Sequence, residues 1–214
     1  MPDFDSSCRR CSRLSEFLDE VKADNPGYYC KPVPPFGDPD AKLIIVGLAP
    51  GMHGANATGR PFTGDYAGIL LYETLYKFGF GSAPESKSVD DGLELVNCRI
   101  TNAVKCLPPG NKPTGKEINE CNAFLAEELN HINDEYIVVA LGTVAHQAVL
   151  KARGLKPTAY KFGHGAQHVL PDGGTLLDSY HCSRYNTQTR RLTTEMFERI
   201  FAQARVLLAE SGNA

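Results

Sequence analysis

Short apolar runs that alternate with helical segments are the feature that most constrains the fold. Four runs have the length and character of strands buried on both faces of a sheet, at 43–46, 98–104, 136–141 and 175–180. Helical patterns flank them at 12–23, at 66–78, from 114 onward, at 143–152 and at 193–210. Strands that alternate with helices predict a parallel sheet flanked by helices. The length of 214 residues suits a single α/β domain, 1–214.

Local signals define several boundaries. Thr114, with Glu117 three residues later, forms a capping box and predicts the start of a helix. Proline and glycine crowd residues 25–40, so an ordered loop is expected there. The stretches 82–92 and 181–191 are polar and are expected to be surface loops.

Function is expected at the carboxyl ends of the predicted strands. In open parallel sheets the binding crevice lies beyond these ends. The segments that follow the strands are polar, and two of the four carry glycine: GLAPGMHGAN at 47–56, TNAVKC at 101–106, ALGTVAH at 140–146 and SYHCSRYN at 179–186. Side chains that carry chemistry are therefore sought in these segments.

Charge is unevenly distributed along the chain. The formal net charge is −3, which taken alone argues mildly against a nucleic-acid partner. Between residues 136 and 194, however, seven Lys or Arg residues stand against two Asp, a local net charge of +5 that leaves −8 for the remainder. Such asymmetry can create a basic face on an acidic protein. Chance clustering on a solvated surface explains the composition equally well.

The seven cysteines indicate metal or redox chemistry rather than disulfides. Their number is odd, and the start MPDFDSSCRR has no apolar stretch typical of a secretory signal. Cys8 and Cys11 form a Cys-x2-Cys pair, and Cys106 and Cys121 follow on a loop after a strand and in the next helix. Four thiolates fit either zinc or an iron–sulfur cluster. Alternatively, Cys106 and Cys121 are ordinary buried thiols.

The segment GRPFTGD at 59–65 carries two candidate site residues. Phe62 offers a flat apolar face on which a planar ligand can stack, and Asp65 offers a carboxylate that can position a water molecule. Alternatively, Phe62 belongs to the core and Asp65 caps the helix that begins near Tyr66. The position of Asp65 directly before this helix favours the cap.

Two more candidates lie near strand ends. His181 follows the last predicted strand, where an imidazole can donate a hydrogen bond to a reacting oxygen. Asn102 lies inside a predicted strand although Asn is depleted in strands, and its amide both donates and accepts, as recognition of a base edge requires. A structural hydrogen bond to a neighbouring loop is the alternative role for Asn102.

The remaining histidines lack metal-ligand spacing with a carboxylate. They are His53, His131, His146, His164 and His168. His146 is expected simply to face outward from its helix.

Taken together, these residues resemble the family 4 and family 5 uracil-DNA glycosylases, and family 5 (type B) most closely. The resemblance runs from Cys8 to about Leu192 and rests on several long motifs in the same order. They are CRRC at 8–11, VGLAPGMHGANATGRPFTGD at 46–65, TNAVKCLPPGNKPT at 101–114, Cys121, VVALGTVA at 138–145 and SYHCSRYNTQTRRLT at 179–193. Family 4 has an acidic residue directly after the first motif glycine, where this chain has Leu48, and this favours type B.

The resemblance implies a fold and a cofactor. The family fold is a central four-stranded parallel sheet with helices on both sides, joined here by an N-terminal cluster-binding segment. In the family, four cysteines bind a structural 4Fe-4S cluster, and the matching residues are Cys8, Cys11, Cys106 and Cys121. The non-ligand cysteines are then Cys30, Cys98 and Cys182.

The resemblance also implies an activity, that of a monofunctional N-glycosyl hydrolase that excises uracil, and other deaminated bases such as hypoxanthine or xanthine, in base excision repair. By similarity, Asp65 orients water or stabilises the cationic sugar, Asn102 reads the base edge, and His181 faces the leaving-group oxygen. Phe62 stacks on the flipped base. The rest of the substrate pocket is expected from Gly47, Ala49, Gly51, His53 and Asn56.

The stretch after His181 is expected to contact the DNA backbone through Arg184, Arg190 and Arg191. The family commonly has Pro directly after this histidine. Here the residue is Cys182, which predicts a less rigid loop.

The expected partner is DNA that contains uracil or another deaminated base. The longest apolar runs are far too short to span a bilayer, so no membrane anchor is expected. Since no secretory signal is seen, a cytoplasmic location is expected by default, and the protein is expected to be a monomer. Two other hypotheses stay open. One is a relative that binds uracil-containing DNA tightly with little turnover, and the other is a non-catalytic, zinc-bound α/β interaction module.

Overall fold

One mixed sheet lies at the centre of the computed structural model, which describes residues 4–132 and 135–211. The strand order is β1-β3-β2-β4-β6-β5. The strands are Phe36–Gly37 (β1), Leu43–Gly47 (β2), Cys98–Asn102 (β3), Ile137–Leu141 (β4), Gln167–Val169 (β5) and Thr175–Ser179 (β6). The four central strands are parallel, which confirms the α/β fold with a parallel centre. The expected count of four strands is wrong, because the sheet has six.

The two additional strands lie at the edges of the sheet. β1 pairs antiparallel with β3, and β5 pairs antiparallel with β6. β1 contains two residues and β5 contains three, which is too short to produce a recognisable periodicity in the sequence. Short edge strands also limit pairing with other chains.

Seven helices flank the sheet within the described residues. They are Ser12–Asp24 (α1), Ala55–Thr58 (α2), Tyr66–Lys77 (α3), Gly115–Asn130 (α4), Thr143–Ala152 (α5), Arg184–Gln188 (α6) and Thr194–Ser211 (α7), with 3-10 turns at Pro109–Asn111 and Pro157–Ala159. The predicted helices correspond to α1, α3, α4, α5 and α7. The capping box of Thr114 and Glu117 is present at the start of α4. None of the described helices is long and apolar enough to cross a membrane.

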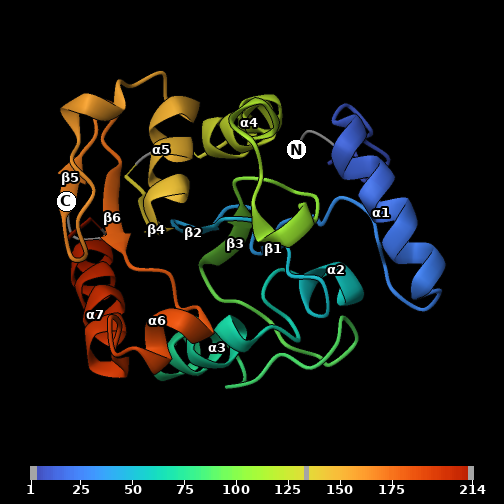
Figure 1. Ribbon diagram of the computed structural model, residues 1–214. Helices are drawn as coiled ribbons and strands as arrows, with labels where there is room; N and C mark the ends of the chain where they lie inside the picture. The colour runs from blue at the N-terminus through green and yellow to red at the C-terminus, as the bar shows by residue number, and fades with distance from the viewer. Residues whose placement is uncertain (1–3, 133–134, 212–214) are drawn as a thin grey trace.

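The central strands bury both of their faces. Leu43 and Ile45 belong to a core closed by α3 and α7, whereas Ile44 and Val46 belong to a core closed by α4 and α5. Figure 1 shows these two pairs of helices on opposite sides of the sheet. Burial on both faces explains why the strands are nearly continuous apolar runs.

Two short helices occupy segments that the sequence suggests are loops. α6 lies within the polar stretch after β6, and the side chain of Ser183 caps it by accepting a hydrogen bond from Asn186 N at 3.4 Å. α2 lies in the glycine-rich segment after β2. Helices of four and five residues carry too few positions to show a helical repeat.

α1 is attached beside α4 at the side of the molecule (Figure 1). Leu14 packs with Val104 and Cys121 in a small apolar cluster. Arg13 makes two contacts of 2.7 Å with the carboxylate of Glu117 on α4. The N-terminal segment is therefore held by small clusters and ion pairs rather than by the two main cores.

His146 does not face outward, so that prediction is wrong. Its side chain on α5 is 1% exposed, and Nδ1 lies 2.7 Å from a carboxylate oxygen of Asp178 on β6. The two residues are 32 positions apart in sequence. Because only the folded sheet brings them together, local spacing cannot reveal the contact.

Candidate active site

A pocket of about 430 Å³ opens at the carboxyl ends of β2, β3 and β6. Its lining comes from the segments that follow these strands and from the start of α3. The lining residues are Leu48, Ala49, Gly51, Phe62, Asp65, Tyr66, Ala67, Asn102, Asn111, His181, Ser183 and Arg184. This is the edge of the sheet at which parallel α/β folds place their ligands.

Asp65 occupies the N-cap position of α3, but its side chain makes no capping hydrogen bond to that helix. Instead, its Oδ2 accepts a hydrogen bond of 3.1 Å from the backbone N–H of Ala55. The local position predicts a cap, and the structure turns the carboxylate toward the segment after β2. The favoured hypothesis from sequence is therefore wrong, and the carboxylate is free to serve the pocket.

Two glycines make room for this carboxylate. A Cβ on Gly51 would lie 2.2 Å from Asp65 Oδ1, and one on Gly54 would lie 2.1 Å from Asp65 Cγ. Burial raises the pKa of Asp65, whereas hydrogen bonds from the backbone of Ala55 and Gly51 and the nearby His53 oppose that rise. The Gly-rich sequence thus fixes the carboxylate in place and supports its ionised form.

Phe62 forms an apolar wall of the pocket. The side chain is only 6% exposed, and it belongs to the core as well as to the pocket lining. Its backbone has φ near +60°, a left-handed conformation that is uncommon outside glycine. A Cβ on Gly47 would lie 2.7 Å from the Phe62 ring, and one on Gly68 would lie 2.0 Å from its carbonyl oxygen. Glycines on both sides therefore hold this strained residue.

Asn102 is the last residue of β3 and reaches the pocket. It is 3% exposed, and its Oδ1 has no hydrogen-bond partner among the described residues. An unsatisfied buried acceptor costs about 1–3 kcal/mol. The expected alternative, a structural hydrogen bond from this oxygen to a neighbouring loop, is not found within the described chain. Its Oδ1 is instead available to a ligand that carries an N–H group.

His181 follows β6 and lies across from Phe62. The two rings are nearly parallel, with an interplanar angle of 26° and centroids 6.0 Å apart. Burial lowers the pKa of His181 to about 4, so the imidazole is neutral at pH 7. Cys182 is fully buried behind it, and its thiol donates to the carbonyl of Ala67 at 3.4 Å. This contact ties the residue after His181 to α3.

Three of the expected pocket residues lie outside the lining. Gly47 lies directly behind Phe62 and Asn102, as the close approach of its Cβ position shows. His53 is exposed, and its Nδ1 lies 2.9 Å from the hydroxyl of Tyr28. Asn56 is fully buried, and its amide nitrogen faces the sulfur of Cys30 at 3.4 Å.

The pocket also contains residues that the sequence-based prediction omits, namely Leu48, Tyr66, Ala67, Asn111 and Ser183. Each is a near neighbour of a quoted motif residue or lies inside a motif. Proximity along the chain to Asp65 or His181 was the available signal for Tyr66, Ala67 and Ser183, whereas Leu48 and Asn111 lie inside the motifs at 46–65 and 101–114.

The three candidate arginines differ in their relation to the pocket. Arg184 lines it, and its guanidinium lies over the ring of Tyr66 at 5.0 Å. Arg191 lies over the ring of Tyr180 at 4.7 Å, and Arg190 is exposed with φ near +57°. All three belong to the segment from the start of α6 to the start of α7, and of the three only Arg184 lines the pocket.

The four candidate cysteine ligands line one small cavity under α1. Burial, together with the nearby thiols of Cys121, Cys8 and Cys11, raises the pKa of Cys106 to about 12. The backbone N–H of Lys105 donates to the sulfur of Cys121 at 3.2 Å. Among the described residues, no three of these sulfurs lie within 4.8 Å of one another.

Comparison with known proteins identifies the family. Residues 34–205 match the model of the Uracil DNA glycosylase superfamily. The chain is 46% identical to the type-5 uracil-DNA glycosylase of Thermus thermophilus, with 94% of both chains covered. It is 42% identical to the type-5 enzyme of Pyrobaculum aerophilum, over 92% of this chain and 88% of that one. It is 32% identical to the type-4 enzyme of Archaeoglobus fulgidus, over 91% and 86% of the two chains. The resemblance predicted from the motifs is therefore confirmed, and the chain belongs to the uracil-DNA glycosylase superfamily, with the type-5 glycosylases among its relatives.

Proposed function

We propose that this protein is a DNA glycosylase that excises uracil from DNA by hydrolysis of the N-glycosidic bond, in base excision repair. The convergence of Asp65, Asn102, His181 and Phe62 on one pocket carries the proposal. The type-5 uracil-DNA glycosylase relatives support it.

Recognition of the base is assigned to Phe62 and Asn102. A base must leave the stacked duplex before chemistry can occur, and an aromatic wall compensates for the lost stacking. The unpartnered Oδ1 of Asn102 accepts from the ring N–H of uracil, and the amide nitrogen donates to the adjacent carbonyl. Hypoxanthine and xanthine present the same pairing of N–H and C=O, so the proposed substrates include these bases.

Cleavage is assigned to Asp65 and His181. When the bond between C1′ and the base nitrogen breaks, its electron pair leaves with the base and the sugar becomes cationic. The Asp65 carboxylate stabilises that cation and orients water, and the neutral His181 imidazole donates a hydrogen bond to the uracil O2. The water oxygen bonds to C1′, and its proton is transferred to the departing base.

The reaction is proposed to stop at base removal. A bifunctional glycosylase needs an amine that forms a Schiff base with the sugar. Among the described residues that line the pocket there is no lysine. An abasic site is therefore the expected product.

An incision assay tests the function directly. End-labelled oligonucleotides that carry uracil, hypoxanthine, xanthine or mispaired thymine are incubated with excess protein and then treated with alkali. Uracil DNA should yield an alkali-dependent break, together with free uracil. The absence of abasic sites with every substrate would contradict the proposal. A protein–DNA complex that survives denaturation, without release of base, would indicate the low-turnover binding relative instead.

We also propose that Cys8, Cys11, Cys106 and Cys121 hold a 4Fe-4S cluster. Four thiols around one cavity cannot ionise together unless a cationic group compensates their charge. Zinc or an iron–sulfur cluster could supply that charge, and the resemblance to the type-5 family favours the cluster. Such a group would cross-link the N-terminal segment to the segment after β3 and to α4. Zinc without iron in anaerobically purified protein would instead support the interaction module.

DNA contact is proposed for the segment of Arg184, Arg190 and Arg191. Arg184 lines the pocket, and Arg190 is exposed in the same segment. The other basic stretch, residues 151–161, is partly engaged elsewhere, since Lys151 donates to Asn119 and Arg153 pairs with Asp172. A backbone interface is therefore assigned to the side of the molecule at which the pocket opens.

A further inference from the structure

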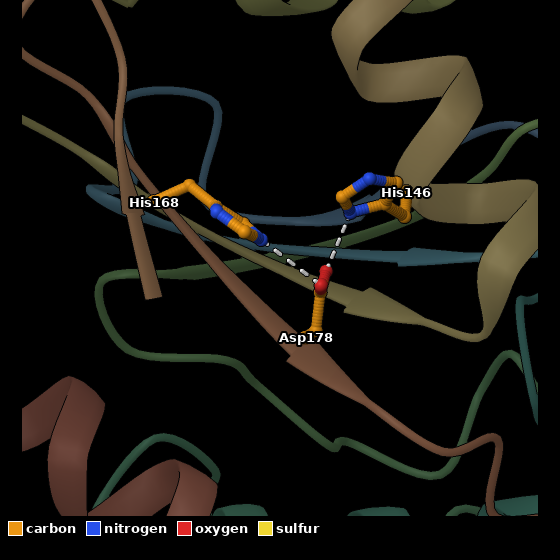
Figure 2. Close-up of side chains that lie close together, drawn as sticks. All are labelled: His146, His168 and Asp178. Atoms are coloured by element: carbon orange, nitrogen blue, oxygen red, sulfur yellow. Dashed lines mark hydrogen bonds and ion pairs between the residues drawn. The ribbon is translucent and has the colours of Figure 1, made fainter. Parts of the chain in front are cut away.

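Three side chains from three different elements meet away from the pocket. Figure 2 shows His146 on α5, His168 on β5 and Asp178 on β6, with both imidazoles pointing at the carboxylate. His146 Nδ1 lies 2.7 Å from Asp178 Oδ1, and His168 Nε2 lies 3.2 Å from Oδ2. One donor atom of each residue lies within 4.8 Å of the other two. The proposed glycosylase chemistry uses none of them.

The surroundings of this cluster orient its donor atoms. His146 Nε2 lies 3.0 Å from the carbonyl oxygen of Tyr160, and the backbone N–H of Gly163 donates to Asp178 Oδ2 at 3.2 Å. A histidine that binds a metal usually donates its other ring N–H to a carbonyl or carboxylate. The contact with Tyr160 fixes the orientation of the ring. Without a metal ion, Nδ1 of His146 carries a proton that it donates to the carboxylate, and a bound metal ion would replace that proton.

A carboxylate that is buried without a compensating positive charge is costly at this place. The Asp178 side chain is fully buried, and those of His146 and His168 are 2% and 15% exposed. One protonated imidazole would already neutralise the carboxylate, so charge alone does not require a second histidine. Two imidazole nitrogens and one carboxylate oxygen are the donors that a divalent metal ion of borderline softness prefers.

We infer that His146, His168 and Asp178 form a zinc site that is separate from the cysteines. Catalytic and open zinc sites commonly use three protein ligands at about 2.0–2.2 Å and a water molecule as the fourth. Because the three side chains come from α5, β5 and β6, folding brings the donors together before the ion binds. Solvent reaches the cluster at His168, which is its most exposed member.

The zinc ion has a structural role. It joins the segment that contains Phe162, His164 and His168 to β6. Phe162 and His164 contact the ring of Tyr180, with centroid distances of 6.3 and 5.1 Å, and Tyr180 directly precedes His181. Bound zinc therefore stabilises the packing around the strand that leads into the pocket.

Metal analysis of the intact protein tests this site. Anaerobically purified protein is dialysed against zinc chloride and then against metal-free buffer, and zinc and iron are both measured. About one zinc per chain should be retained with no loss of iron. X-ray absorption spectroscopy at the zinc edge should show only nitrogen and oxygen atoms bound to the zinc. Bound sulfur atoms, or zinc that replaces iron, would place the ion at the cysteines and overturn the inference.

His168→Gln is the informative variant, because it removes one ligand and leaves the pair of His146 and Asp178 intact. Zinc affinity should fall by about 100-fold or more, because the loss of a residue that only hydrogen-bonds to a metal ligand already lowers metal affinity by about 10- to 100-fold. A zinc concentration of 100 times Kd should raise the melting temperature of the wild type by roughly 5–10 °C, but not that of the variant. His131→Gln, at an exposed position, is the matched control.

No retained zinc in the wild type would overturn the inference, as would equal zinc affinity in wild type and His168→Gln. His146, His168 and Asp178 would then form only a hydrogen-bonded ion pair. The stoichiometry and spectroscopy of the wild type decide the question even where the variant fails to fold.

Discussion

The base pocket and the cysteine site are held in place by different forces. In the pocket, Asp65 accepts a backbone hydrogen bond from Ala55, and Phe62 packs closely against Gly47. The protein chain alone fixes these groups before any ligand binds. In the cysteine site, burial raises the pKa of Cys106 and Cys121, and neighbouring thiols add to the rise. With the proposed 4Fe-4S cluster, that site depends on a group that the chain does not supply.

This difference predicts that the two sites respond separately to change. Loss of a thiol should remove iron and fold stability together, because a bound metal group contributes its binding free energy to folding. A change at Gly51 or Gly54, the glycine cradle that makes room for the Asp65 carboxylate, should remove activity while iron and fold remain. Four variants or measurements test this separation.

The largest effect is expected from Cys106→Ala. Iron and the brown colour should be lost, and the melting temperature should fall by about 10 °C or more, as loss of several kcal/mol implies for a chain of this size. Cys30→Ala is the control and should remain brown, because Cys30 does not line the cysteine cavity. A colourless, stable and active Cys106→Ala protein would show that the cysteine site is not needed for the fold.

Gly54→Ala should damage the pocket alone. Its new Cβ would lie 2.1 Å from Asp65 Cγ, so the carboxylate must move. A displacement of about 1 Å can cost on the order of 100-fold in rate. Single-turnover excision should fall by about that factor with iron content unchanged. Gly115→Ala is the matched control, because a Cβ there meets no atom within 4 Å. Equal rates in both variants would show that the absence of a side chain at Gly54 is not needed to position Asp65.

Substitution of Arg190 and Arg191 should affect DNA binding rather than the base pocket or the cysteine site. Replacement of both by Ala should weaken binding to all DNA sequences and lower the slope of log affinity against log salt by about 2. Affinity titrations between 50 and 200 mM salt measure the slope. Lys156→Ala, in the other basic stretch, should leave it unchanged. An unaltered slope in the double variant, with a reduced slope in Lys156→Ala, would move the interface to that stretch.

The smallest effect is expected from pH near neutrality. His181 has its pKa lowered to about 4, so it stays neutral as pH falls through 6.5, where an ordinary histidine gains its proton. Asp65 must be ionised, so the rate falls as the pH passes below its raised pKa. His181 should add no step of its own to the single-turnover rate between pH 6.5 and 8. A clear step near 6.5 that disappears in His181→Asn would contradict a neutral imidazole.

The sequence predicts the interior of the fold better than its periphery. The central strands and the long helices are predictable because apolar burial on both sheet faces leaves continuous runs, as in Leu43 to Val46. β1, β5, α2 and α6 are missed because elements of two to five residues depend on pairing or capping partners elsewhere. Ser183, for example, defines α6 by one side-chain hydrogen bond that composition does not reveal.

Site residues are predictable where the chain order places them at strand ends. Asn102 and His181 were found in this way, and both line the pocket. Position alone gives the wrong hypothesis for Asp65, because the choice between α3 and Ala55 N depends on the path of the glycine-rich segment. His146 and Asp178 meet only across the sheet, so local spacing could not indicate their contact.

The Asp65 carboxylate is proposed to act in catalysis, beyond its structural contact with the backbone N–H of Ala55. The most direct measurement is the single-turnover rate of uracil excision by Asp65→Ala and Asp65→Asn, with DNA affinity and melting temperature measured alongside. Both variants should lose on the order of 10²–10³ in rate and keep DNA affinity, because both remove the negative charge. If Asp65 only accepts the hydrogen bond from Ala55, both variants should keep the wild-type rate, and Asp65→Ala should lose about 1 kcal/mol of stability whereas Asp65→Asn keeps an acceptor. That second result would contradict the account.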